Sequence, residues 1–142
     1  MLGLGFRVLG ELGKAQGWLA MKGFRELRVW QQGIDLVTEI YRATEKFPAC
    51  EAYGLTSQVR RAAVSIPSNI AEGHVREHIK EYLNHLSMAQ ASLAEVETQV
   101  EIALRLKYLA SDQAKPLLER SASLARQLYA LRKALKGPRH ES

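Results

Sequence analysis

Residues 47–73 read FPACEAYGLTSQVRRAAVSIPSNIAEG, and this stretch decides the fold. It predicts a loop followed by a helix that starts near Leu55 or Thr56, because Thr56 or Ser57 can cap free backbone N–H groups. Gly73 is expected to end this helix as a C′ residue. Apolar residues recur at helical spacing between these points, at Val59, Ala62, Ala63, Ile66, Ile70 and Ala71.

Three further segments show helical periodicity on either side of this stretch. One spans about residues 24–46 and ends before Pro48, since the residue before a proline tends to leave the helical region. Another spans about residues 78–107 and carries a seven-residue apolar repeat. The last is expected to be capped by Ser111 or Asp112 and to end at Gly137-Pro138. Because the connections are short, the sequence predicts an all-α fold, an up-down antiparallel four-helix bundle.

The chain of 142 residues corresponds to one domain. Residues 1–20 differ in composition from the rest, with four glycines in the first thirteen positions, a density that opposes both helix and strand. Two interpretations remain open for them: a flexible N-terminal arm, or natural translation that starts at Met21 instead. In both cases, we expect the bundle domain to span residues 21–142.

No arrangement of residues in the sequence is typical of an enzyme. Three histidines lie close together in the sequence: His74, His78 and His85. His74 follows the expected helix end at Gly73, so the three side chains do not share one helix face and do not supply the third fixed ligand that a metal site needs. Cys50 has Glu51 beside it rather than a base or a cation that would favour a reactive thiolate. We therefore expect no catalytic activity, no cofactor and no metal site.

The cellular location is predicted from two simple features. The chain contains one cysteine, so it cannot form an internal disulfide, and nothing indicates an oxidising compartment. No apolar run approaches the ~20 residues that a membrane-spanning helix needs. We expect a cytoplasmic protein that does not enter the membrane.

The positive charge is concentrated at the C-terminal end. From Lys115 onward there are seven basic and two acidic residues, and this excess equals the net charge of +5 for the whole chain. A basic end of this kind has two interpretations. It is a solvated helix face with cations near its C-terminus, which the helix dipole favours, or it contacts an anionic partner such as RNA or DNA. The candidate nucleic-acid contacts are Arg120, Arg126, Arg132, Lys133, Lys136 and Arg139.

The adjacent pair Arg60 and Arg61 precedes an acidic stretch of the third predicted helix. Between residues 81 and 101 this helix carries acidic residues and no lysine or arginine. We expect Arg60 and Arg61 to form structural ion pairs across a helix interface, and the less favoured alternative is a nucleic-acid contact. The expected carboxylate partners are Glu95, Glu97 and Glu101.

Several short motifs together resemble one bacterial family. These are FRELRVW at residues 24–30, YGLTSQVRRAA at 53–63, SIPSNIAEG at 65–73 and SLAEVETQ at 92–99, with Phe47-Pro48 and Glu51 between them. The resemblance is to the proteins encoded within intervening sequences of large-subunit ribosomal RNA genes and to their free-standing four-helix bundle relatives. That family is similar to the accessory proteins of diversity-generating retroelements, which form pentameric barrels and bind nucleic acid through a basic surface. The resemblance therefore implies a homo-oligomer, most simply a ring of five.

Two functional hypotheses follow from these features. The first is a non-catalytic oligomeric helical scaffold that binds nucleic acid through its basic fourth helix and tail. The alternative is a protein–protein interaction module with no nucleic-acid role. Salt-dependent binding separates them, because phosphate contacts release counterions and weaken as salt rises. Four aromatic residues are predicted to lie in the core, so base stacking on them is not expected: Trp30, Tyr41, Tyr82 and Tyr129.

Overall fold

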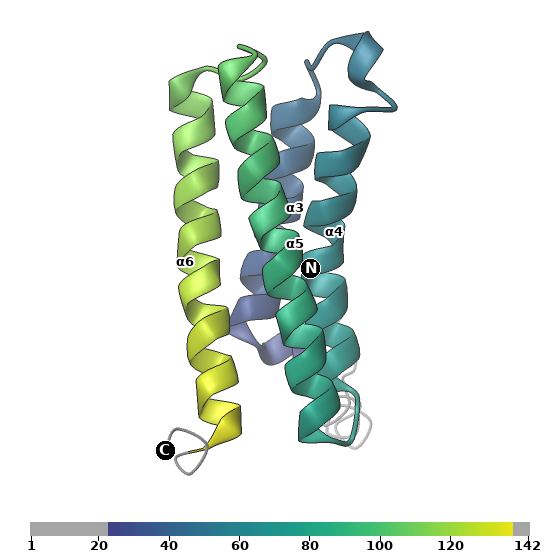
Figure 1. Ribbon diagram of the computed structural model, residues 1–142, viewed down its shortest axis with the longest axis vertical. Helices are drawn as coiled ribbons and strands as arrows, with labels where there is room; N and C mark the ends of the chain where they lie inside the picture. Colours follow the sequence, from purple (N-terminus) through teal and green to yellow (C-terminus); the bar gives the residue numbers. More distant parts are fainter. Residues whose placement is uncertain (1–22, 138–142) are drawn as a thin grey trace, which may run out of the picture.

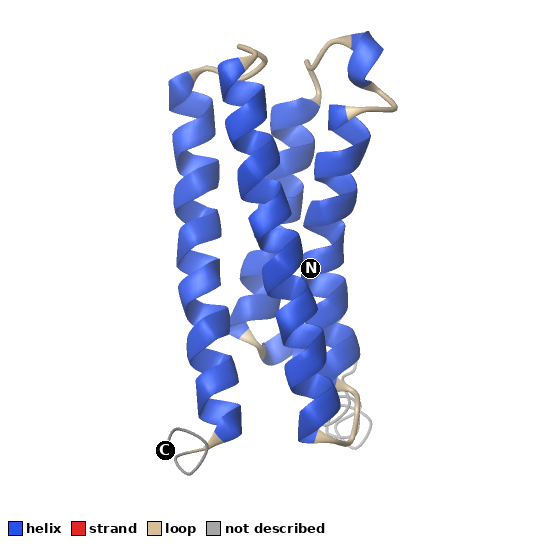
Figure 2. Cartoon of the chain, viewed as in Figure 1, coloured by secondary structure: helices blue, strands red, loops and turns tan. Residues whose placement is uncertain are grey.

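The computed structural model describes residues 23–137, and this part of the chain consists of helices joined by short loops (Figures 1 and 2). Two short 3-10 helices accompany four long α-helices, and no strand occurs among the described residues. The all-α prediction is confirmed. In chain order the elements are η1 (Gly23–Glu26), α3 (Arg28–Thr44), η2 (Ala49–Glu51), α4 (Leu55–His74), α5 (Ile79–Arg105) and α6 (Ser111–Lys136).

The four long helices lie side by side as a bundle in which each helix packs against two neighbours. Helix α4 contacts α3 and α5, and α6 contacts α5 and α3, so the contacts form a closed cycle. The α3–α4 and α5–α6 connections lie at one end of the molecule, and the α4–α5 connection lies at the opposite end (Figure 1). The C-terminal half of α6 therefore lies near the same end as the α4–α5 connection.

The core is apolar and receives side chains from every long helix. These side chains recur at three- and four-residue steps along each helix, so one stripe per helix faces inward. Burying such a side chain contributes about 1.5–3 kcal/mol, and these contacts are the main stabilisation of the bundle. Side chains no more than 1% exposed include Leu36, Ile40, Ile66, Ile70, Leu86, Leu93, Leu124 and Leu128.

Gly73 does not end helix α4, contrary to the prediction. The helix continues to His74, and Val75 is its C-cap. Gly73 is buried instead, and a Cβ atom at this position would lie 2.7 Å from the Cβ of His85 and 3.0 Å from Cδ1 of Tyr82. The glycine therefore permits the close approach of α4 to α5.

The predicted N-caps of α4 and α6 are also wrong. Helix α4 has Gly54 as its N-cap, and the first helical N–H, that of Leu55, donates to Oε1 of Glu51 at 3.0 Å. The hydroxyl oxygen of Thr56 is buried and makes no hydrogen bond among the described residues. Ser111 is the first residue of helix α6 rather than its cap, and the N-cap is Ala110, whose N–H donates to Oε1 of Gln113 at 2.8 Å. Gly137 ends α6 as predicted, with a φ of 79°.

Candidate functional site

Three of the predicted nucleic-acid contacts lie on one face of α6. Arg126, Lys133 and Lys136 are all exposed. At about 100° per residue, Arg126 and Lys133 point within roughly 20° of each other and Lys136 lies about 80° from Arg126. No carboxylate in the described part of the chain lies within ion-pair distance of these three side chains. We refer to Arg126, Lys133 and Lys136 as the basic face.

Arg132 does not belong to the basic face. It is half-buried, and its Nη1 donates to Oε1 of Gln90, which links α6 to α5. Its Nε is buried without a hydrogen-bond partner in the described residues. A guanidinium engaged in this way is positioned to hold two helices together, so its first role is packing.

Arg120 is also separate from the basic face. Arg120 points about 140° away from Lys133 around the helix. It lines a hollow of about 310 Å³ between α3 and α6, which it shares with two carboxylates, Glu39 and Asp112, and with Arg42. Arg139 lies outside the described residues. The structure therefore brings together three of the six predicted residues.

Arg60 contacts α3 rather than the glutamates of α5. Its Nε donates to Oγ1 of Thr44 at 2.8 Å, and its Nη2 donates to the carbonyl of Tyr41 at 3.3 Å. The guanidinium carbon lies 4.4 Å from the centroid of the Tyr41 ring, a cation–π distance. Arg60 thus links α4 to α3 through partners other than the expected glutamates.

The other members of the predicted ion-pair set are distributed along α4 and α5. Arg61 and Glu95 are exposed, and both line the same hollow, described below. Glu101 pairs with Arg105 of its own helix at 3.2 Å. Glu97 is half-buried on α5. In the part of the chain that the structure describes, none of these three glutamates forms an ion pair with Arg60 or Arg61.

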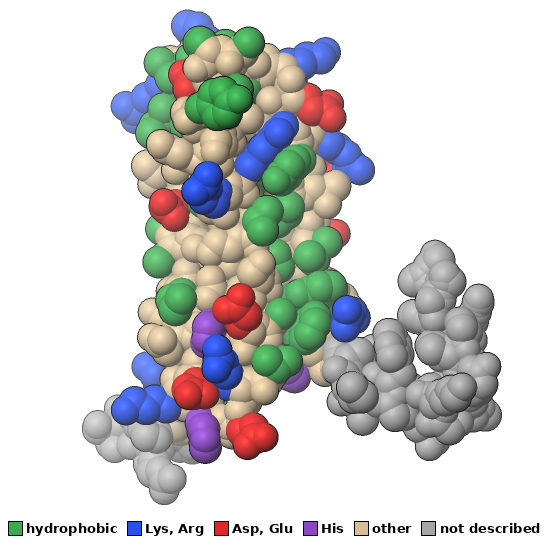
Figure 3. All heavy atoms as spheres, turned by 90° about the vertical axis from the view of Figure 1, so that its right-hand side faces the viewer, with side chains coloured by type: hydrophobic (Ala, Val, Ile, Leu, Met, Phe, Trp, Pro, Cys, Tyr) green, Lys and Arg blue, Asp and Glu red, His purple; other side chains and the backbone are tan. Residues whose placement is uncertain are grey.

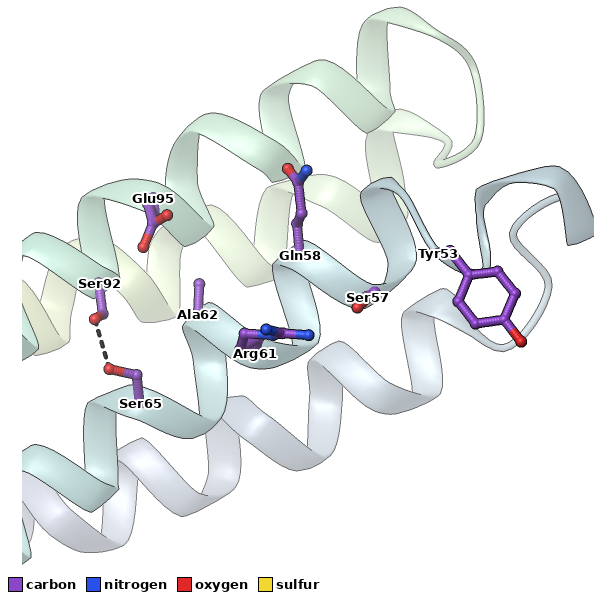
Figure 4. A pocket seen from close by; sticks show the side chains of 8 residues that line it. All are labelled: Tyr53, Ser57, Gln58, Arg61, Ala62, Ser65, Ser92 and Glu95. Atoms are coloured by element: carbon purple, nitrogen blue, oxygen red, sulfur yellow. Dashed lines mark hydrogen bonds between the residues drawn. The ribbon is translucent and has the colours of Figure 1, made fainter.

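A polar hollow of about 520 Å³ lies along the surface between α4 and α5 (Figure 4). Figure 4 shows it as an elongated strip, with Tyr53 at one end and the Ser65–Ser92 pair and Glu95 toward the other. Tyr53 is 99% exposed. Every lining residue belongs to the motifs at residues 53–63, 65–73 and 92–99: Tyr53, Ser57, Gln58, Arg61, Ala62, Ser65, Ser92 and Glu95.

A chain of hydrogen bonds extends from this hollow along the α4–α5 interface. The hydroxyls of Ser65 and Ser92 are 2.7 Å apart, and Asn69 Nδ2 donates to the Ser65 hydroxyl at 3.1 Å and to its carbonyl at 3.0 Å. Nδ1 of His85 lies 3.0 Å from Oδ1 of Asn69. His85 is thus engaged between helices, and no group of three or more metal-ligating side chains occurs among the described residues.

Two tyrosines lie at the surface rather than in the core. Tyr129 is 61% exposed and Tyr41 is 41% exposed, so the prediction that they are core residues is wrong. The helical phase of α6 contained the signal for Tyr129. It follows the fully buried Leu128 directly and therefore points about 100° away from it, beyond the apolar seam.

Comparison with known proteins identifies the family. Residues 25–130 match the 23S rRNA-intervening sequence proteins, which is most of the chain. This chain belongs to that family. Among solved structures, the intervening sequence protein described here is similar to a protein of unknown function from the S23 ribosomal protein family of Bacteroides thetaiotaomicron. The two chains are 20% identical with a TM-score of 0.67, and the match covers 74% of this chain and 98% of the other. That likeness supports the fold.

No curated protein matches the sequence of this intervening sequence protein. Within residues 23–137, every helix is too short or too polar to cross a membrane.

Proposed function

We propose that this intervening sequence protein is a non-catalytic oligomeric scaffold that binds nucleic acid through the basic face of α6 and the adjoining tail. The observation that carries the proposal is the exposure of Arg126, Lys133 and Lys136 on one side of a helix, without carboxylate partners in the described residues. Cations that already had partners would gain little from a phosphate. Unpaired cations release counterions from nucleic acid when they bind it.

The binding experiment is a titration of RNA and DNA at several salt concentrations. The parent should bind less tightly as salt rises, with each phosphate contact contributing about 0.7–0.9 to the slope of log K against log salt. Replacing Arg126, Lys133 and Lys136 together by alanine should reduce this slope by about two units or more. Arg132 is left unchanged because its loss would also disturb the α5–α6 contact.

A matched control removes the same charge elsewhere. Arg42, Lys46 and Lys107 are exposed, and they lie toward the end of the bundle that carries the α3–α4 and α5–α6 connections. Their replacement by alanine should leave the salt slope nearly as in the parent. Equal losses in both triple variants would indicate a general charge effect. A parent without salt-dependent binding would contradict the proposal.

We propose further that the up-down bundle assembles into a homo-oligomeric ring, with five copies as the number that the family resemblance implies. Apolar side chains remain exposed on α3 and α4, namely Ile34, Tyr41 and Val64, at 39%, 41% and 40%. Figure 3 shows hydrophobic side chains gathered in a stripe on the face that contains α4. Contiguous apolar surface of this kind marks association sites. Light scattering should give five times the chain mass of 15.9 kDa, and a monomer mass at micromolar concentration would contradict ring formation.

The second candidate function is a protein–protein interaction module. The observation that favours it is the α4–α5 hollow, whose lining combines Arg61, Glu95 and the fully exposed Tyr53. A lining with one cation and one anion suits a polypeptide better than a polyanion. This function takes first place if the parent shows no salt-dependent binding of RNA or DNA. Both functions suit a cytoplasmic protein, since the single cysteine, Cys50, is exposed and free.

A further inference from the structure

The exposed Tyr129 lies within the basic face of α6. It follows Arg126 by three residues and precedes Lys133 by four and Lys136 by seven. At about 100° per residue, all four side chains fall within roughly 80° of the helix circumference. The face extends over ten residue steps, or about 15 Å along the helix axis. A large aromatic ring, 61% exposed, is therefore flanked by three cations that have no carboxylate partner in the described residues.

The bundle does not require this tyrosine. Its neighbour Leu128 is fully buried and fills the core, whereas Tyr129 points away from the seam. No hydrogen bond, ring contact or cation–π contact occupies its ring or hydroxyl among the described residues. The ring is thus available to a ligand.

An exposed aromatic among cations has a specific binding chemistry. Proteins that bind single strands combine cations along the backbone with aromatic rings on which unpaired bases stack. In a duplex the bases are already stacked on each other, so a ring on a helix surface gains no base face, and the cations alone would act. An aromatic ring among cations therefore favours single-stranded over double-stranded nucleic acid.

We propose that the basic face binds single-stranded nucleic acid, with one base stacked on Tyr129 and phosphates held by Arg126, Lys133 and Lys136. The inference rests on the proposed nucleic-acid function and goes beyond it, because it names the strand state of the ligand and an aromatic contact. The spacing along α6 suits a stretch of a few nucleotides.

The test measures fluorescence anisotropy of a labelled oligothymidylate and of a duplex of equal length, at several salt concentrations. We expect the parent to bind the single strand more tightly than the duplex. Tyr129→Leu keeps apolar bulk but removes the aromatic face, so it should weaken single-strand binding about 5- to 150-fold. It should leave the salt slope and duplex binding unchanged. Tyr129→Trp should retain or improve single-strand binding.

The matched control is Tyr53→Leu. Tyr53 is 99% exposed but lines the α4–α5 hollow, away from the basic face, so its replacement should not affect binding of the oligothymidylate. Circular dichroism and light scattering on each variant confirm that the helices and the assembly mass are unchanged. A Tyr129→Leu variant with an altered assembly mass would place Tyr129 at an interface between copies and overturn the inference.

The remaining outcomes separate the two proposals. Salt-dependent binding that Tyr129→Leu leaves intact, or equal affinity for single strand and duplex, would overturn the stacking inference while the basic face retained its role. A parent that binds neither nucleic acid in a salt-dependent way would overturn both proposals.

Discussion

The hydroxyl of Tyr108 donates to Oε2 of Glu51 at 2.9 Å, although the two residues are 57 positions apart in the chain. The other carboxylate oxygen accepts the backbone N–H of Leu55 at 3.0 Å. One side chain thus caps the start of α4 and connects it to the segment after α5. The ring of Tyr108 also packs on Phe47, with centroids 5.4 Å apart.

This arrangement predicts a stability that depends on pH. The backbone N–H of Leu55 and, second, the Tyr108 hydroxyl hold the pKa of Glu51 below its ordinary value. A carboxyl with a depressed pKa in the folded state stabilises the fold above its unfolded pKa, about 4.3, and loses that contribution as pH falls through the lower folded value. Glu51→Gln should be less stable than the parent at pH 7, and the difference should shrink in acid. Urea denaturation of both proteins, at pH 7 and in acid, measures the difference between their free energies of unfolding. A difference that does not change with pH would contradict this role of Glu51.

The close contact of α4 with α5 predicts that Gly73 tolerates no side chain. Gly73→Ala places a Cβ 2.7 Å from that of His85, so the helices must separate, at a cost of about 1–3 kcal/mol. Gly33→Ala is the control, since its Cβ would lie 3.4 Å from Pro67, an ordinary contact, and alanine favours the helix by about 1 kcal/mol. Thermal unfolding should rank the proteins with Gly33→Ala at or above the parent and Gly73→Ala below it. Equal stability of the two variants would show that Gly73 is not a packing residue.

Helical periodicity predicted the helices and most of the core. Residues such as Ile66, Leu93 and Leu128 lie at the spacing that places one stripe of apolar side chains on the inward-facing side of each helix. Periodicity could not predict the role of Gly73. A glycine is favourable both at the end of a helix and where two helices approach closely, and only the distance between α4 and α5 shows which of the two applies.

The candidate site was less predictable from the sequence than the core. The contact of Arg132 with Gln90 depends on the register of α6 against α5, which spacing within one helix does not determine. The exposure of Tyr129 could have been predicted from helical phase, but assignment by residue type placed it in the core.

The separate surroundings of Arg60 and Arg61 predict unequal effects. Arg60→Ala removes the hydrogen bond to Thr44 and the contact with the Tyr41 ring, each contributing about 0.5–1.5 kcal/mol. Arg61 is exposed, so Arg61→Ala should change the free energy of unfolding by no more than about 0.5 kcal/mol. Urea denaturation compares the two variants. If Arg61→Ala is the more destabilising change, a further contact, such as one between copies, must engage Arg61.

The end of α5 predicts a stabilising substitution. Lys107 has a φ of 65°, and the N–H of Tyr108 donates to the carbonyl of Ala103 while that of Lys107 donates to Leu104. These two bonds define a Schellman motif, whose left-handed residue is usually glycine because a Cβ there is unfavourable. Lys107→Gly should therefore raise the free energy of unfolding by about 1 kcal/mol, despite the entropy that glycine adds to the unfolded chain.

The control for this substitution is a glycine placed inside the same helix. Arg105→Gly lies in the last turn of α5, where the backbone is right-handed, so it should lower the free energy of unfolding by up to about 1 kcal/mol. Urea denaturation of the parent and both variants gives the comparison. If Lys107→Gly raises the free energy of unfolding and Arg105→Gly lowers it, the backbone conformation at Lys107, rather than the loss of a lysine side chain, sets the effect. If both variants are less stable than the parent, the left-handed backbone at Lys107 is not a source of strain.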